Sequence, residues 1–95
     1  MKTDYQNSIV DKIRELRHIR GVSQLSLSVT LGISEGHIGN IETPNKPHKY
    51  TLSQLAMICD EFDYPIEELF LGDIQGVPQE DVIRRLINCI IEYEK

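Results

Sequence analysis

The stretch SQLSLSVTLGISEGHIGNIE, residues 23–42, decides the fold of this chain. Ser23 and Ser34 are favourable N-caps, because a serine hydroxyl accepts a hydrogen bond from a free amide in the first turn of a helix. Gly32 lies between them and takes readily the positive φ angle that a tight turn between two helices requires. The stretch therefore predicts two short helices on either side of this turn, at residues 24–31 and 35–42.

The two predicted helices have an apolar inner side and leave one polar face outside. Their apolar residues are spaced so that the helices pack against each other at a steep angle: Leu27, Leu31, Ile33, Ile38 and Ile41. Ser28 falls where the helices approach most closely, so a small side chain is needed there. The outer face of the second helix carries Ser34, Glu35, His37 and Asn40. An apolar inner side combined with a polar outer face is typical of a helix whose exposed side binds a partner.

Outside this stretch, apolar residues recur at helical spacing and no segment alternates as a strand does. We expect a first helix at residues 8–20, with Ile9, Ile13, Leu16 and Ile19 facing inward. Thr51 and Gln54 form a capping box for a helix at 52–62. Pro65 begins a short helix, and Pro78 opens a last one that runs to about Tyr93. The expected fold class is all-α: a five-helix bundle plus a C-terminal helix.

Charge is distributed unevenly along the chain. Residues 1–50 hold seven Lys and Arg against five Asp and Glu, giving +2, and residues 51–95 hold three against ten, giving −7, for the total of −5. A basic front half permits contact with DNA through one face, whereas the acidic total argues against a protein that coats DNA non-specifically.

Several other classes of protein are disfavoured. No apolar run reaches the roughly 20 residues that span a bilayer, and residues 1–12 are polar, so we expect a cytoplasmic protein without membrane association. Cys59 and Cys89 lie in apolar helical patterns without metal-ligand spacing, so we expect two reduced core thiols and no metal. Catalytic constellations and phosphate-cradling glycine loops are missing. We therefore expect neither an enzyme nor a cofactor, and no small-molecule effector is evident.

Residues 9–70 resemble the Cro/phage-repressor type of helix-turn-helix domain, also called the xenobiotic-response-element family. The resemblance rests on Gln24, the Leu27-Ser28 pair, the Leu31-Gly32-Ile33 turn, Ile38, Ile41, Glu42 and the segment TLSQLAMICDEFDYPIEELF at residues 51–70. It implies a repressor-like bundle and a sequence-specific regulator of transcription, a repressor that binds double-stranded DNA. In such a protein the helix at 35–42 enters the major groove.

The resemblance also implies roles for single residues. The positions that would face base edges are Glu35, Gly36, His37 and Asn40. Arg17 and Glu42 match a pair that forms a structural salt bridge. Gln24 and Ser34 are expected at phosphates, together with four donors of the basic loop TPNKPHKY: Lys46, His48, Lys49 and Tyr50. The alternatives are a solvated polar face and a solvated loop. Gly36 and Gly39 are unfavourable inside a helix, because each costs about 1 kcal/mol relative to alanine.

The segment after Gly72 extends beyond the family core. We expect residues 1–72 to form the DNA-binding domain and residues 73–95 a helix that packs on it and dimerises through Ile83, Ile87, Ile90 and Ile91. A two-fold dimer would bind two half-sites about one DNA turn apart. The alternative is a sixth core helix in a monomer. The competing function is a protein-interaction module, or an antitoxin-like subunit, that uses the same scaffold without reading DNA itself.

Overall fold

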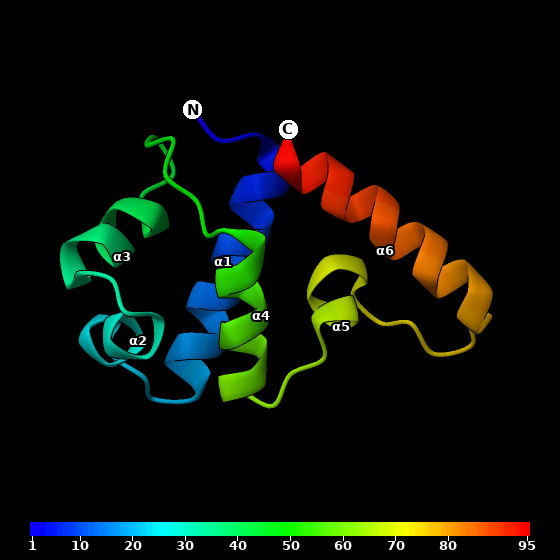
Figure 1. The fold of residues 1–95 in the computed structure, drawn as a ribbon, viewed down its shortest axis with the longest axis horizontal. Coiled ribbons are helices and arrows are strands. Elements are labelled where there is room, and N and C mark those ends of the chain that lie inside the picture. The colour runs from blue at the N-terminus through cyan, green and yellow to red at the C-terminus, as the bar shows by residue number, and fades with distance from the viewer.

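Six helices and no strand make up the structure, a computed structural model that describes all 95 residues (Figure 1). In chain order they are α1 (Asp4–Ile19), α2 (Gln24–Leu31), α3 (Glu35–Glu42), α4 (Leu52–Glu61), α5 (Ile66–Leu71) and α6 (Gln79–Glu94). The all-α fold class is confirmed, and α2 and α3 have the predicted bounds. None of the six helices combines the length and apolar character that crossing a bilayer requires.

The first helix begins four residues earlier than the sequence pattern predicted. Thr3 is its N-cap: the Thr3 hydroxyl accepts a hydrogen bond from the Gln6 amide at 3.1 Å, and the Gln6 side chain accepts one from the Thr3 amide at 2.9 Å. This capping box starts the helix at Asp4. The inward placement of Ile19 was also wrong, because this side chain is 69% exposed. Arg17 takes the inner position in that last turn instead.

The core lies where the first five helices meet. In Figure 1, α1 and α4 stand in the middle, with α2 and α3 on one side and α5 and α6 on the other. Fifteen buried apolar residues form one cluster, which includes Ile13, Leu27, Ile38 and Leu55 from four different helices. Tyr93, near the end of α6, belongs to the same cluster. The core is therefore shared by the helix-turn-helix segment and the C-terminal helix.

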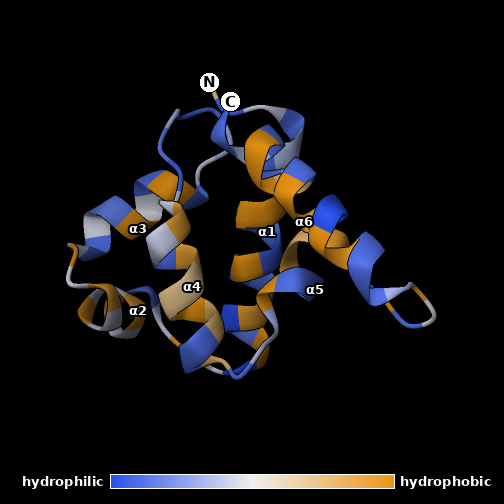
Figure 2. Cartoon of the chain, turned by 45° about the vertical axis from the view of Figure 1, so that its right-hand side comes forward, coloured by the Kyte–Doolittle hydropathy of each residue, from blue (hydrophilic) through white to orange (hydrophobic).

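The end of α6 is fixed to the start of the chain. The Tyr93 hydroxyl donates to the Tyr50 carbonyl at 2.6 Å, and the Tyr93 carbonyl accepts from the Gln6 amide group at 2.7 Å. These contacts bring the two termini together at one end of the molecule, as Figure 1 shows. From there α6 runs away from α1 along α5, and apolar residues occupy much of its length (Figure 2).

The apolar arc of α6 divides between two sides. Ile83, Ile87 and Ile91 are 57%, 51% and 55% exposed and form a stripe that faces outward. Ile90, which the sequence pattern grouped with them, packs against the core beside Leu86 and Cys89. Ile90 therefore does not belong to the exposed stripe, because its position one residue before Ile91 turns it toward the body of the protein.

Candidate nucleic-acid interface

The turn between α2 and α3 is set by Gly32, which has a φ of 70° and caps α2 in the left-handed conformation. The amide of Ile33 then donates back to the Ser28 carbonyl at 3.0 Å. Ser28 itself is buried, and its hydroxyl is satisfied by the Leu25 carbonyl at 2.6 Å. Because Ser28 is small and internally hydrogen-bonded, the two helices pack closely and α3 is held with its outer face in solvent.

The outer face of α3 combines polar side chains with an uncovered stretch of backbone. Ser34 caps the helix by accepting from the His37 amide at 3.1 Å. Glu35 is exposed, and its carboxylate makes no ion pair. Gly36 is exposed as well, and a methyl group added there would meet no atom within 4 Å. His37 and Asn40, three residues apart on the same helix, are partly buried. This face therefore offers hydrogen-bonding groups beside a backbone that a partner could approach closely.

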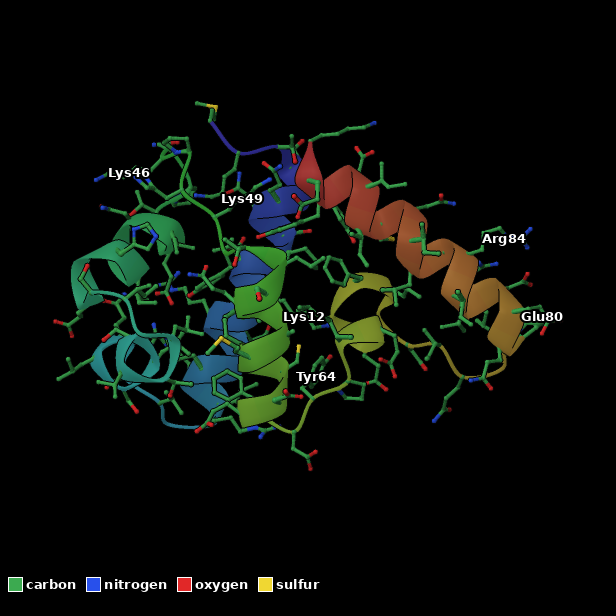
Figure 3. All side chains as sticks on the ribbon, in the orientation of Figure 1. Lys12, Lys46, Lys49, Tyr64, Glu80 and Arg84 are labelled. Atoms are coloured by element: carbon green, nitrogen blue, oxygen red, sulfur yellow. The ribbon has the colours of Figure 1, made fainter.

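Two residues of the loop that follows lie against this face. The Lys46 ammonium donates to the Asn40 side-chain carbonyl at 2.9 Å, and the His48 ring meets the His37 ring edge to face at 5.7 Å. Lys46 and His48 are exposed. Figure 3 shows Lys46 on the outer side of the loop, above α3. The loop thus extends the polar surface of α3 with a cation and a second imidazole.

Of the other two predicted phosphate contacts of this loop, the full burial of Tyr50 contradicts one, and Lys49 is engaged elsewhere in the free protein. Tyr50 is fully buried in the core, and its hydroxyl has no hydrogen-bond partner. Burial, together with the charge of Glu42, raises the pKa of Tyr50. Lys49 points the other way from Lys46 (Figure 3): its ammonium donates to the Tyr93 carbonyl at 2.8 Å and lies 4.9 Å from the centre of the Tyr93 ring. The Lys49 side chain and the Tyr50 carbonyl therefore serve the junction with α6, and the buried Tyr50 hydroxyl is out of reach of a phosphate.

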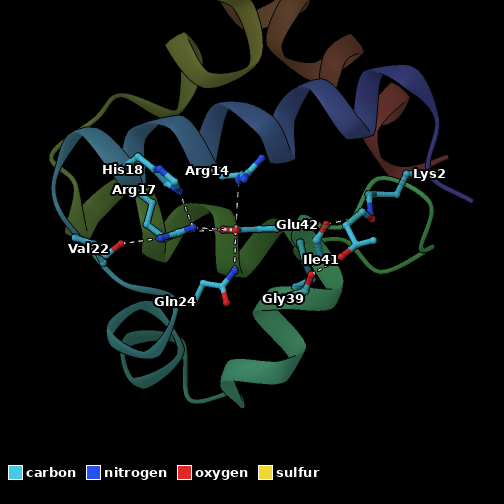
Figure 4. Close-up of polar contacts among 10 residues, drawn as sticks. Lys2, Arg14, Arg17, His18, Val22, Gln24, Gly39, Ile41 and Glu42 are labelled. Carbon is cyan, nitrogen blue, oxygen red and sulfur yellow. Dashed lines mark hydrogen bonds and ion pairs between the residues drawn. The ribbon is translucent and has the colours of Figure 1, made fainter.

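A buried ion pair joins the first helix to the end of α3. The Arg17 guanidinium donates to both carboxylate oxygens of Glu42 at 2.9 Å, as Figure 4 shows. Arg17 also donates to the Val22 carbonyl at 2.9 Å. Arg14 lies 3.8 Å from the same carboxylate. The bidentate geometry fixes α3 against α1, because two parallel hydrogen bonds set both distance and orientation.

Gln24 is the third partner of Glu42. Its side-chain amide donates to the carboxylate at 3.0 Å, so it links the start of α2 to the end of α3 (Figure 4). Burial alone would raise the pKa of Glu42, but the hydrogen bonds from Arg17 and Gln24 and the charges of Arg17 and Arg14 outweigh it and lower the pKa. The side chain of Gln24 therefore braces α3 in the free protein.

The sequence pattern missed Lys2, which is only 5% exposed. Its ammonium lies within hydrogen-bond distance of four carbonyl oxygens around the end of α3 and the following loop: Ile41 at 3.1 Å, Thr43 at 3.1 Å, Lys46 at 2.7 Å and His48 at 2.7 Å. Burial lowers the pKa of Lys2, and the charge of Asp11 opposes this shift. A single lysine near the chain start gives no periodic signal, so only the folded chain reveals this contact.

Comparison with known protein families identifies the helix-turn-helix segment. Residues 12–71, more than half of the chain, match the model of the family described as Cro/C1-type HTH DNA-binding domain. Searches of curated proteins and of solved structures gave no match. Among the side chains, no group of three or more His, Cys, Asp or Glu is placed to hold a metal ion. With its matching sequence and its paired α2 and α3, this chain belongs to the Cro/C1-type helix-turn-helix family of DNA-binding regulators.

Proposed function

We propose that this protein is a sequence-specific transcriptional repressor that acts in the cytoplasm and inserts α3 into the major groove of double-stranded DNA. The observation that carries the proposal is the outer face of α3, where polar side chains and uncovered backbone are joined by Lys46 and His48 from the loop. An α-helix with its side chains is about 10–12 Å in diameter, and the major groove is about 12 Å wide. Repression is the mode of regulation that needs only occupancy of the site.

Three side chains of α3 are proposed to read bases. Asn40 can make the paired contact with N6 and N7 of adenine, and Glu35 can accept from N4 of cytosine. His37 can donate to a purine N7. Gly36 lies between Glu35 and His37 in the sequence, and because it has no side chain its backbone can approach the groove. Each well-formed contact discriminates by about 1–3 kcal/mol against the wrong base.

The phosphate contacts are proposed to flank this helix. The proposed groups are Ser34 at its N-terminus, Lys46 and His48 in the loop, and the backbone amides at Gln24. Contacts of this kind set the position of a protein on DNA but carry no sequence information. In the free protein Lys46 is hydrogen-bonded to Asn40. DNA binding would exchange that bond for a phosphate on Lys46 and a base on Asn40.

We further propose a two-fold dimer formed by α6, with residues 1–72 as the DNA-binding unit and residues 73–95 as the dimerisation element. The stripe Ile83, Ile87 and Ile91 has equal spacing on either side of Ile87. Two antiparallel copies that cross at Ile87 would therefore place Ile83 of one chain opposite Ile91 of the other. An isologous contact requires this kind of self-complementarity.

The dimer is tested by Ile87→Glu, with Ile19→Glu as the matched control because Ile19 is an exposed isoleucine on another helix. Analytical ultracentrifugation should show a dimer for the unchanged chain and for the control, and a folded monomer for Ile87→Glu. A monomeric unchanged chain would refute the dimer. Circular dichroism checks that each variant keeps its helices.

The central proposal is tested by selecting bound duplexes from a random-sequence DNA pool at low and at moderate salt. Enrichment of a two-fold-symmetric site, with half-sites about one helical turn apart, supports a dimeric sequence-specific regulator. Weak binding without an enriched sequence, abolished by moderate salt, refutes it. That second outcome would favour the protein-interaction module or antitoxin-like subunit, for which the acidic half of the chain would be the docking surface.

A further inference from the structure

We propose that Lys2 positions the DNA-contacting loop, acting as a built-in cation that ties the end of α3 to residues 43–48. This inference rests on the proposed function, because the loop supplies the phosphate contacts of Lys46 and His48. Lys2 itself touches no nucleic acid in this arrangement. It would be a positioning residue for the interface, provided by a part of the chain that precedes the family match at residues 12–71.

The geometry around Lys2 is that of a cation site made from backbone. Four carbonyl oxygens converge on its ammonium at 2.7–3.1 Å, and three N–H groups are shared among them. One of the four, from Ile41, belongs to the last turn of α3, where a helix has no internal donor for its carbonyls. A positive charge is favourable there because the helix dipole is negative at its C-terminus. Lys2 thus binds both the last turn of α3 and the loop that follows it.

The loop depends on this anchor because it has few other internal hydrogen bonds. Its prolines, Pro44 and Pro47, have no amide hydrogen to donate. One backbone bond closes it, from the Lys46 amide to the Thr43 carbonyl at 3.2 Å. The carbonyls of Lys46 and His48 are held by Lys2, and the side chains of the same two residues face α3. Removing the ammonium would leave four carbonyl dipoles pointing at one another, so the loop would open toward water.

The test uses the duplex that the unchanged chain enriches from the random pool. Lys2→Met keeps an unbranched side chain, one atom shorter, but removes the charge and the donors, and Lys12→Met is the matched control. Lys12 lies on α1, well apart from Lys46 in Figure 3. If the loop is correctly placed in a tenth of the Lys2→Met molecules, their affinity falls about tenfold. The slope of affinity against salt should stay unchanged, because no phosphate contact is lost.

A second variant separates positioning from general destabilisation. Lys2→Ala removes the atoms of propylammonium, so adding this ion to the variant should restore part of the lost affinity. Tetramethylammonium at the same concentration has no N–H group and should restore none. Amide hydrogen exchange gives a readout without DNA: exchange at Thr43 and Lys46, whose amides are hydrogen-bonded in the loop, should be faster in Lys2→Met, with α1 and α4 unchanged.

Each outcome decides. Tenfold weaker binding with an unchanged salt slope, faster exchange in the loop and rescue by propylammonium supports the proposal. Binding equal to that of the unchanged chain overturns it, and so does a salt slope lower by about one, which would make Lys2 a phosphate contact. If Lys2→Met does not fold, the proposal is overturned when propylammonium and tetramethylammonium have the same effect on the DNA affinity of Lys2→Ala. If the unchanged chain binds no duplex, the proposed function fails, and loop exchange still tests the anchor.

Discussion

Replacing Arg17 by methionine should destabilise the protein far more than the loss of one surface charge would. Arg17→Met keeps the aliphatic stem but leaves the Glu42 carboxylate buried, with only 5% of its side-chain surface exposed. Gln24 at 3.0 Å and Arg14 at 3.8 Å remain near it. The Val22 carbonyl also loses its donor. The variant therefore converts a satisfied ion pair into a buried charge with partial compensation.

The magnitude follows from what such a charge costs. Removing one partner of a buried pair destabilises proteins by about 3–5 kcal/mol, and the two remaining donors place this case near the lower end. A domain of 60–100 residues loses about 4–8 °C in Tm for each kcal/mol. We therefore expect a Tm lower by about 12–24 °C. Against a typical total stability of about 5–15 kcal/mol, the variant would stay folded at room temperature.

Urea unfolding followed by circular dichroism measures the effect, and two further variants complete the experiment. Arg84→Met removes the arginine of an exposed ion pair with Asp81 in α6 and should cost less than about 1 kcal/mol. The double variant Arg17→Met/Glu42→Met replaces both charges by apolar groups and should be more stable than Arg17→Met alone. The reasoning is refuted if Arg17→Met and Arg84→Met cost the same, or if the double variant is the least stable.

Salt dependence, backbone freedom, acid and thiol chemistry supply four more tests. Lys46→Ala should lower the slope of DNA affinity against salt concentration by about one. Lys49→Ala should leave this slope unchanged, since the Lys49 ammonium is held by α6. Equal slopes for the two variants would contradict this assignment. Gly36→Ala should raise the free energy of unfolding by about 1 kcal/mol, because the added methyl group meets no neighbouring atom. The same variant should weaken operator binding. Unweakened binding would argue against a close approach of this backbone to DNA. The pKa of Glu42 is lowered in the folded protein, so the stabilisation that its charge provides is lost when acid protonates it. Below about pH 4.3, the ordinary glutamate pKa, Tm should therefore fall more steeply for the unchanged chain than for Glu42→Gln. Parallel curves of Tm against pH would exclude this cause. Burial, with the nearby acidic charges, raises the pKa of Cys59 to about 11. Mass spectrometry should therefore find this thiol unmodified by iodoacetamide until the protein unfolds. Rapid labelling of the folded chain would contradict the burial of Cys59.

The helix-turn-helix segment could be predicted from the sequence because its determinants are local. Ser23 and Ser34 cap helices within three residues of themselves, and Gly32 supplies its φ angle without help from the rest of the chain. The pairing of Arg17 with Glu42 spans 25 residues and came from the family resemblance. Thr3 and Gln6 carried the same local signal as Thr51 and Gln54, so the early start of α1 was predictable in principle.

The loop was predicted poorly because its contacts are made with distant residues. A lysine or tyrosine in a basic loop has the same local pattern whether its side chain faces DNA or the core. The outcome for Lys49 and Tyr50 depends on Tyr93, more than 40 residues away. Ile90 differs from Ile91 for a related reason, since only the packing of α6 decides which side of a wide apolar arc is covered.

These distant contacts give the ends of the chain a role in the proposed interface. The family match at residues 12–71 contains α3 and the whole loop, but Lys2, Gln6 and Tyr93 lie outside it. Lys2 holds the loop from the α3 side, and Tyr93, braced by Gln6, holds it from the α6 side through Lys49 and Tyr50. Since phosphate contacts position a protein while base contacts specify its sequence, changes at the termini should alter affinity for all duplexes alike. The base preference of α3 would be retained, because its side chains and its brace on Arg17 lie within the matched segment.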